Sequence, residues 1–221
     1  MYSNINFDET LIMSSDIKEY QFSCGVRIRL LEKQNEKGNM DFIYEITNPT
    51  NRMIRLNCSN GIIYDKNNNI ADTLDCGFFH FNDLKFPIES LSRGLIPLYI
   101  RPYIPIENFG RFIQTIQLED VTSEFEEEIN IRVSRSEFFV NEWDFIQCGY
   151  ITNISKFFSG NKEVYIRILL FDGYGNPTHQ HTNILDEDDC EPGTSFHTIG
   201  GCVYLKHKQP TNKVVYIYSK D

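Results

Sequence analysis

Long apolar runs are missing from this chain. No stretch approaches the roughly 18–20 apolar residues that a membrane-spanning helix needs. Residues 1–9 also lack the basic start and the short apolar run of a secretory signal. If Met1 is the native start, these two absences predict a cytoplasmic protein with no membrane partner. A leader removed before Met1 would overturn that prediction.

Basic residues are also in short supply. Lys and Arg total 21 against 31 Asp and Glu, so the formal net charge is −10. Proteins that bind nucleic acid neutralise phosphates with Lys and Arg, and no basic stripe offsets the acidic balance here. The composition therefore argues against a nucleic-acid partner and leaves another protein as the expected one.

The cysteines show no metal-binding or disulfide pattern. Three fall in each half of the chain, and there is no C-x-x-C pair. An odd number in each half cannot pair completely within a domain, so the pattern predicts free thiols and a reducing compartment. The six residues are Cys24, Cys58, Cys76, Cys148, Cys190 and Cys202.

Helical periodicity is nearly absent, because no window of twelve residues keeps apolar side chains at i, i+3, i+4 and i+7. Seventeen Phe and twelve Tyr stand against one Trp, and such rings favour strands. Apolar residues alternate with polar ones over Cys24 to Leu30 and over Phe42 to Ile46, which is the period of a half-buried strand. The sequence therefore predicts an all-β protein.

Two short motifs recur about a hundred residues apart. Ile46-Thr47-Asn48 returns as Ile151-Thr152-Asn153, and Tyr64-Asp65 before an Asn-rich turn returns as Phe171-Asp172 before a Gly-rich turn. The repeat predicts that Ile46 and Ile151 occupy equivalent positions, and Tyr64 and Phe171 likewise. It predicts two tandem immunoglobulin-like antiparallel β sandwiches. The expected ranges are an N-terminal arm or edge strand at 1–19, a first domain at 20–136 and a second at 137–221.

The second half resembles the FxLYD-type immunoglobulin-like domains of bacteria over about residues 145–221. Leu170-Phe171-Asp172 stands where that family carries Leu-Tyr-Asp, and Glu191 to Phe196 stands where it carries a Pro-Gly turn. Gly149 to Ser155 matches its first strand and turn. The resemblance implies a seven-stranded sandwich that serves as a non-catalytic adhesive or accessory module, and it supplies no catalytic residues.

Two histidines form the best candidate metal pair. His179 and His181 lie two positions apart, and strand residues at that spacing point to one face, so both imidazoles are able to share a zinc ion. Cys190 or His197 would supply a third ligand. The alternative is that both histidines face solvent on an edge strand beside a polar turn.

Two acidic runs are candidate binding surfaces. Asp186 to Glu191 carries oxygen ligands of the kind calcium takes, but it lacks the glycine and final glutamate of the helix–loop–helix calcium pattern. A solvated loop is the alternative, and Glu124 to Glu128 is expected to be a hairpin turn. Either run is also able to attract a basic protein partner. The candidate contact residues are Glu126, Glu127, Glu128, Asp186, Asp188 and Asp189.

Aromatic side chains crowd the expected junction between the two domains. A flexible linker would be rich in Gly and Ser or charged, whereas this segment carries Phe138, Phe139 and Trp143. Large rings are costly to leave in water, so one expectation is that they pack between the domains. The other is that part of the patch stays exposed as an anchor for a partner.

No catalytic motif is present: the chain has no G-x-S-x-G, no G-x-x-x-x-G-K-[ST] and no G-x-G-x-x-G after a strand. The sequence therefore predicts a non-enzymatic protein-interaction protein without a cofactor. In its sharper form it is a cytosolic inhibitor, an immunity factor or an anti-defence factor of bacterial or phage origin. One alternative is an envelope or extracellular adhesive module that lacks its leader. The other is a metal-dependent hydrolase that uses His179 and His181.

Overall fold

The computed structural model describes residues 7–36, 39–74, 87–100, 106–140, 146–155, 163–185, 191–200, 203–205 and 208–220. Within these ranges the regular structure is all strand, apart from one 3-10 turn, η1 (Ile106–Asn108). This confirms the all-β prediction. Contacts divide the chain into two compact units, Met1–Thr122 and Ser123–Asp221.

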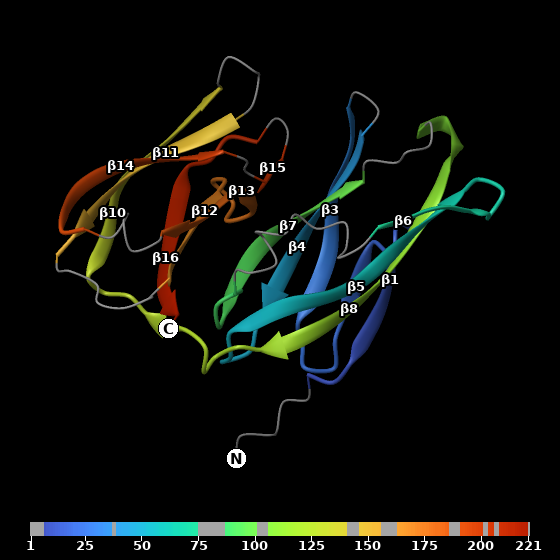
Figure 1. Ribbon diagram of the computed structural model, residues 1–221, viewed down its shortest axis with the longest axis horizontal. Helices are drawn as coiled ribbons and strands as arrows, with labels where there is room; N and C mark the ends of the chain where they lie inside the picture. Colours follow the sequence, from blue (N-terminus) through green and yellow to red (C-terminus); the bar gives the residue numbers. More distant parts are fainter. Residues whose placement is uncertain are drawn as a thin grey trace. The chain divides into compact units, whose positions relative to one another are not determined.

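Unit 1 is a β sandwich of two antiparallel sheets, coloured blue to green in Figure 1. The first sheet has the order β1 (Thr10–Ser14), β8 (Phe109–Asp120), β5 (Ile54–Asp65) and β6 (Ile70–Leu74). The second has the order β2 (Glu19–Gln21), β3 (Arg27–Glu36), β4 (Asn39–Asn48) and β7 (Ser92–Ile100).

The core of unit 1 lies between these sheets. Alternation along β4 turns Phe42, Tyr44 and Ile46 inward, as the sequence predicts, and all three are buried. Phe42 meets Phe112 of β8 edge to face, with ring centroids 5.4 Å apart. Edge-to-face pairs of this kind add to the free energy that burial of the rings provides.

Unit 2 is a second sandwich, coloured yellow to red in Figure 1. Its smaller sheet has the order β10 (Ile131–Val140), β11 (Ile146–Ile154) and β14 (Gly193–Gly200). Its larger sheet has the order β15 (Val203–Tyr204), β13 (Pro177–Leu185), β12 (Glu163–Phe171), β16 (Asn212–Lys220) and β9 (Glu126–Glu127).

The two units share one connection order. The row β3-β4-β7 corresponds to β10-β11-β14, and the row β6-β5-β8 corresponds to β13-β12-β16. In each unit the first strand, β1 or β9, pairs antiparallel with the last strand, β8 or β16. The chain therefore repeats a topology, and not only a pair of short motifs.

The same turn closes the central hairpin of each unit. Asp65 Oδ1 accepts hydrogen bonds from the backbone N–H groups of Asn67 and Asn69, each at 2.8 Å. Asp172 Oδ1 accepts them in the same way from Tyr174 and Asn176, each at 2.9 Å. Tyr64 and Phe171 directly precede these aspartates, so they occupy equivalent positions as predicted.

The predicted equivalence of Ile46 and Ile151 is wrong by one residue. Ile46 is fully buried in the core, whereas the inward side chains of β11 are Tyr150, Thr152 and Ile154. Ile151 points to the opposite face and is half-buried. Successive strand residues alternate between faces, so a shift of one position reverses the face even when the letters match.

The boundary between the units falls earlier than the sequence suggests. The expected division at 136/137 lies inside β10, which pairs with β11 of unit 2 on both sides of that point. Before it, β9 pairs with β16 of the same unit. The division therefore lies at Thr122 and Ser123. Residues 1–19 also contain β1, which forms the edge of the first sheet.

Candidate binding site

The two candidate metal ligands lie on β13, whose neighbours are β12 and β15. His181 is fully buried and His179 is nearly so, which corrects the expectation that both face solvent on an edge strand. They share the inward face, because they lie opposite Ile168 and Leu170 of β12. His179 Nδ1 lies 3.0 Å from the hydroxyl of Thr178.

Burial decides the charge of these histidines. Desolvation lowers the pKa of His179, and desolvation together with the neighbouring His179 lowers the pKa of His181 to about 3. Within the described ranges, no group of three or more His, Cys, Asp or Glu residues is placed to hold a metal ion. Cys190 and the side chain of His197 lie outside the described residues.

The acidic candidates separate into two kinds. Glu126 and Glu127 are exposed on β9, in keeping with a contact surface. Glu128 is buried instead, and its Oε1 accepts hydrogen bonds from the backbone N–H and the side-chain amide of Asn130 at 2.7 and 2.6 Å. Glu128 therefore supports the local turn. Asp186, Asp188 and Asp189 lie outside the described residues.

Two of the three aromatic candidates lie in a strand and not in a linker. Phe138 and Phe139 are strand residues of β10, paired with Cys148 and Gln147 of β11. Their side chains, and Trp143 as a whole, lie outside the described residues.

A pocket of about 390 Å³ opens at one end of the smaller sheet of unit 2. Three polar side chains form a row across its strands, because Arg132 of β10 lies opposite Asn153 of β11, which lies opposite Thr194 of β14. All three are exposed, while Ile131 and Ile154, of opposite alternation, belong to the core. The full lining is Ile129, Asn130, Arg132, Asn153, Ile154, Ser155, Gly193 and Thr194.

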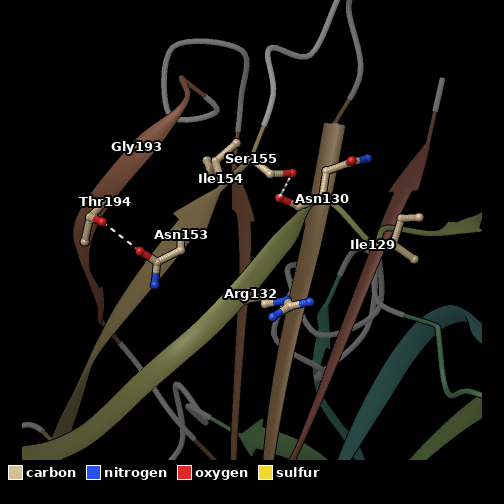
Figure 2. A pocket seen from close by; sticks show the side chains of 8 residues that line it. All are labelled: Ile129, Asn130, Arg132, Asn153, Ile154, Ser155, Gly193 and Thr194. Atoms are coloured by element: carbon tan, nitrogen blue, oxygen red, sulfur yellow. Dashed lines mark hydrogen bonds between the residues drawn. The ribbon is translucent and has the colours of Figure 1, made fainter.

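Hydrogen bonds fix the polar rim of the pocket. Figure 2 shows Asn153 and Thr194 turned toward each other, and the Thr194 hydroxyl donates to Asn153 Oδ1 at 2.7 Å. The Ser155 hydroxyl donates to the carbonyl oxygen of Asn130 at 3.2 Å, and the Ser155 N–H donates to that oxygen at 2.9 Å. These bonds tie the end of β11 to both neighbouring strands.

The lining of the pocket is polar and apolar, with Arg132 as its one charged residue among those described. None of its eight described residues is a His, Cys, Asp, Glu or Lys, so the pocket itself holds no general base. Ile129 is 77% exposed at its rim, and an exposed side chain of that size is available for an apolar contact. Sequence reasoning noted Asn153 as part of a motif but missed Arg132 and Thr194, which only the strand register brings together.

No family model matches the chain. No curated protein sequence matches it either. Solved structures show distant likeness. A glycosyl hydrolase family 2 member from Bacteroides cellulosilyticus is 10% identical with a TM-score of 0.21, and the match covers 76% of this chain and 22% of that one. A calcium-binding mutant of beta-glucuronidase 2 from Bacteroides uniformis is 8% identical with a TM-score of 0.20, over 94% and 32%.

The N-terminal CBM22-1-CBM22-2 tandem domain of Paenibacillus barcinonensis Xyn10C is 8% identical with a TM-score of 0.16, and the match covers 99% of this chain and 91% of that one. This chain spans less than a third of the length of the two hydrolases. Likeness at this level says nothing about the function of the chain. Within the described residues, no helix is long and apolar enough to cross a membrane.

Proposed function

We propose that this is a non-enzymatic protein-interaction protein built from two tandem immunoglobulin-like sandwiches. The observation that carries the proposal is the pocket at the end of β10, β11 and β14. It offers an exposed isoleucine, an arginine and amide groups, but no general base among its described lining residues. Such a surface is suited to holding a partner in place and not to transforming a substrate.

The immunoglobulin-like part of the proposal is supported by topology. In each unit a sheet of hairpin-connected strands faces a sheet built around a second hairpin, and the chain crosses between the two layers. The Asp172 turn stands where FxLYD-type domains carry their Leu-Tyr-Asp motif, and the Asp65 turn has the same hydrogen bonds. We extend the FxLYD resemblance to both units on this basis.

A cytoplasmic partner is the sharper form of the proposal, with this chain as the inhibitor, immunity or anti-defence factor. The acidic charge and the free thiols Cys24 and Cys58 support it. The burial of His179 and His181 favours binding over the hydrolase alternative, because a hydrolytic metal needs a position open to water and substrate.

Photo-crosslinking tests this proposal directly. Ile129 would be replaced by p-benzoylphenylalanine, and the full-length protein would be irradiated in a lysate of its host. The matched control carries the same replacement at Tyr174, which is 93% exposed on the β12–β13 turn of the same unit. We expect one dominant cross-linked protein from position 129 and none from position 174. Equal labelling from both positions would refute the pocket as the contact surface.

A further inference from the structure

The hydrogen bonds around the pocket leave a defined set of groups for a ligand. The hydroxyl of Thr194 is committed to Asn153 Oδ1, so the free donor of that carboxamide is its Nδ2 group. Asn153 Nδ2 makes no hydrogen bond within the described part of the chain. It lies beside Arg132, because the two residues are directly opposed on neighbouring antiparallel strands. Two donors, one of them charged, therefore stand side by side.

Arg132 is available to an anion. It forms no ion pair with any described residue, whereas Arg27, Arg29 and Arg55 each meet a glutamate. The carboxylate of Glu128, four positions earlier in the chain, is buried and bound by Asn130. In a chain with a net charge of −10, an exposed arginine next to an amide donor is a specific attraction for a carboxylate, which accepts a bidentate pair from guanidinium.

The rest of the pocket suits an apolar group with a peptide N–H beside that carboxylate. Ile129 stands exposed at the rim, and the hydroxyl oxygens of Ser155 and Thr194 retain lone pairs that are able to accept a hydrogen bond. Gly193 has φ 139°, and among the described residues no atom outside its chain neighbours lies within 4 Å of where a Cβ would stand. The volume of about 390 Å³ corresponds to about a dozen water molecules, the size of one or two residues.

The geometry points to capture of a free C-terminal carboxylate on an apolar residue of a protein partner. Arg132 and Asn153 hold the carboxylate. The hydroxyl oxygen of Ser155 or Thr194 accepts a hydrogen bond from the peptide N–H of the same C-terminal residue, and Ile129 contacts the apolar side chain of that residue. This inference rests on the proposed function, since it names the part of the partner that the same pocket takes.

Isotope-edited NMR on the full chain tests it with three small probes. N-acetyl-leucine imitates an apolar C-terminus, N-acetyl-leucinamide lacks the carboxylate, and 4-methylpentanoic acid lacks the amide. We expect N-acetyl-leucine to shift the signals of Arg132, Asn153 and Thr194, and the amide probe to bind about tenfold more weakly or worse, the size of a charge-assisted contact. Equal binding of N-acetyl-leucinamide would overturn the carboxylate assignment.

The third probe separates a peptide terminus from a small organic acid. If 4-methylpentanoic acid binds as tightly as N-acetyl-leucine, the N–H contact is refuted and the ligand is a small acid. Arg132→Gln should weaken N-acetyl-leucine binding about tenfold or more. The control Arg27→Gln, which removes a partly exposed arginine of unit 1 that pairs with Glu19, should leave it unchanged. Unchanged binding by Arg132→Gln would overturn the proposal.

The two proposals fail in different ways. A specific cross-link from position 129 without any carboxylate binding would keep the interaction function and refute the C-terminal ligand. Carboxylate binding without a cross-linked protein would keep the anion site and refute a protein as its occupant.

Discussion

Truncation of Ile168 should destabilise unit 2 by about 3–4 kcal/mol. Ile168 is fully buried on the inward face of β12, where His181 of β13 and Val215 of β16 lie opposite it. Ile168→Ala removes three carbons, which at about 0.8 kcal/mol each accounts for about 2.4 kcal/mol. Strands on both sides hold β12 in place and oppose collapse, so the remaining cavity adds about 1–1.5 kcal/mol.

The assay is urea unfolding followed by circular dichroism, alongside a thermal scan. For a unit of about 100 residues the loss corresponds to roughly 12–30 °C in melting temperature. Ile168→Val removes a single methylene and should cost about 0.5–1.5 kcal/mol. The matched control is Ile129→Ala, the same change in the same unit at a side chain that is 77% exposed, where we expect a cost within about 0.5 kcal/mol.

The decisive result is how the three variants rank in their loss of unfolding free energy. If Ile168→Ala costs no more than Ile129→Ala, the inward face of β12 is not the core of unit 2, and the sandwich described here is refuted. A large loss from Ile168→Ala with none from Ile168→Val would indicate that the site repacks around a smaller side chain, which contradicts the cavity contribution.

Three further predictions concern titratable side chains. Hydrogen bonds from Asn69 and Asn176 lower the pKa of Asp65 and of Asp172, so each carboxylate should stabilise its turn above the ordinary aspartate pKa and lose that effect as pH falls through the lowered value. Alanine at both aspartates should flatten the acid limb of a urea-midpoint profile. Burial raises the pKa of the Cys58 thiol to about 12, so Cys58 should react slowly with a disulfide reagent in the native protein, while denaturant should release close to six thiols. His181, with its pKa near 3, should stay neutral in an NMR titration down to about that pH. Because the same histidine in the unfolded chain binds a proton near pH 6.5, the free energy of unfolding should fall as pH decreases from about 6.5 toward 3. His181→Gln should make this decrease with pH less steep.

Local structure could be predicted from the sequence where all the residues that determine it lie in one short segment. The Asp172 turn is such a case, because the aspartate, the glycines and Asn176 lie within five positions and complete their hydrogen bonds among themselves. The inward alternation of Phe42, Tyr44 and Ile46 is another, since strand geometry fixes it. These signals suffice for the all-β class and for the repeated hairpin.

Features that depend on long-range register could not be predicted. Arg132 and Thr194 are far apart in the sequence, and they share a pocket only because β11 lies between their strands. Ile151 reads as the partner of Ile46, but the strand alternation that decides its face is set by β10 and β14. The sequence around His179 and His181 is typical of an exposed edge strand, whereas β13, which carries them, is paired with β12 on one side and β15 on the other.

Arg167 shows the same limit inside the larger sheet of unit 2. Its sequence surroundings are those of a half-exposed strand, yet both faces of β12 are buried. Its guanidinium donates to Gln180 Oε1 at 3.1 Å and lies 4.5 Å from the centre of the Tyr216 ring. Desolvation lowers the pKa of Arg167 to about 10. The residues that surround this charge come from three strands: Arg167 from β12, Gln180 from β13 and Tyr216 from β16.

The pairing of the first strand with the last has a consequence for synthesis on the ribosome. Ile12 of β1 pairs with Thr115 of β8, 103 positions later, and Glu127 of β9 pairs with Tyr218 of β16, 91 positions later. At about 5–20 residues per second, β1 emerges several seconds before its partner is made. During that interval its backbone donors and acceptors are open to other chains. β1 (Thr10–Ser14) is therefore a segment that a nascent-chain chaperone would cover until β8 is made.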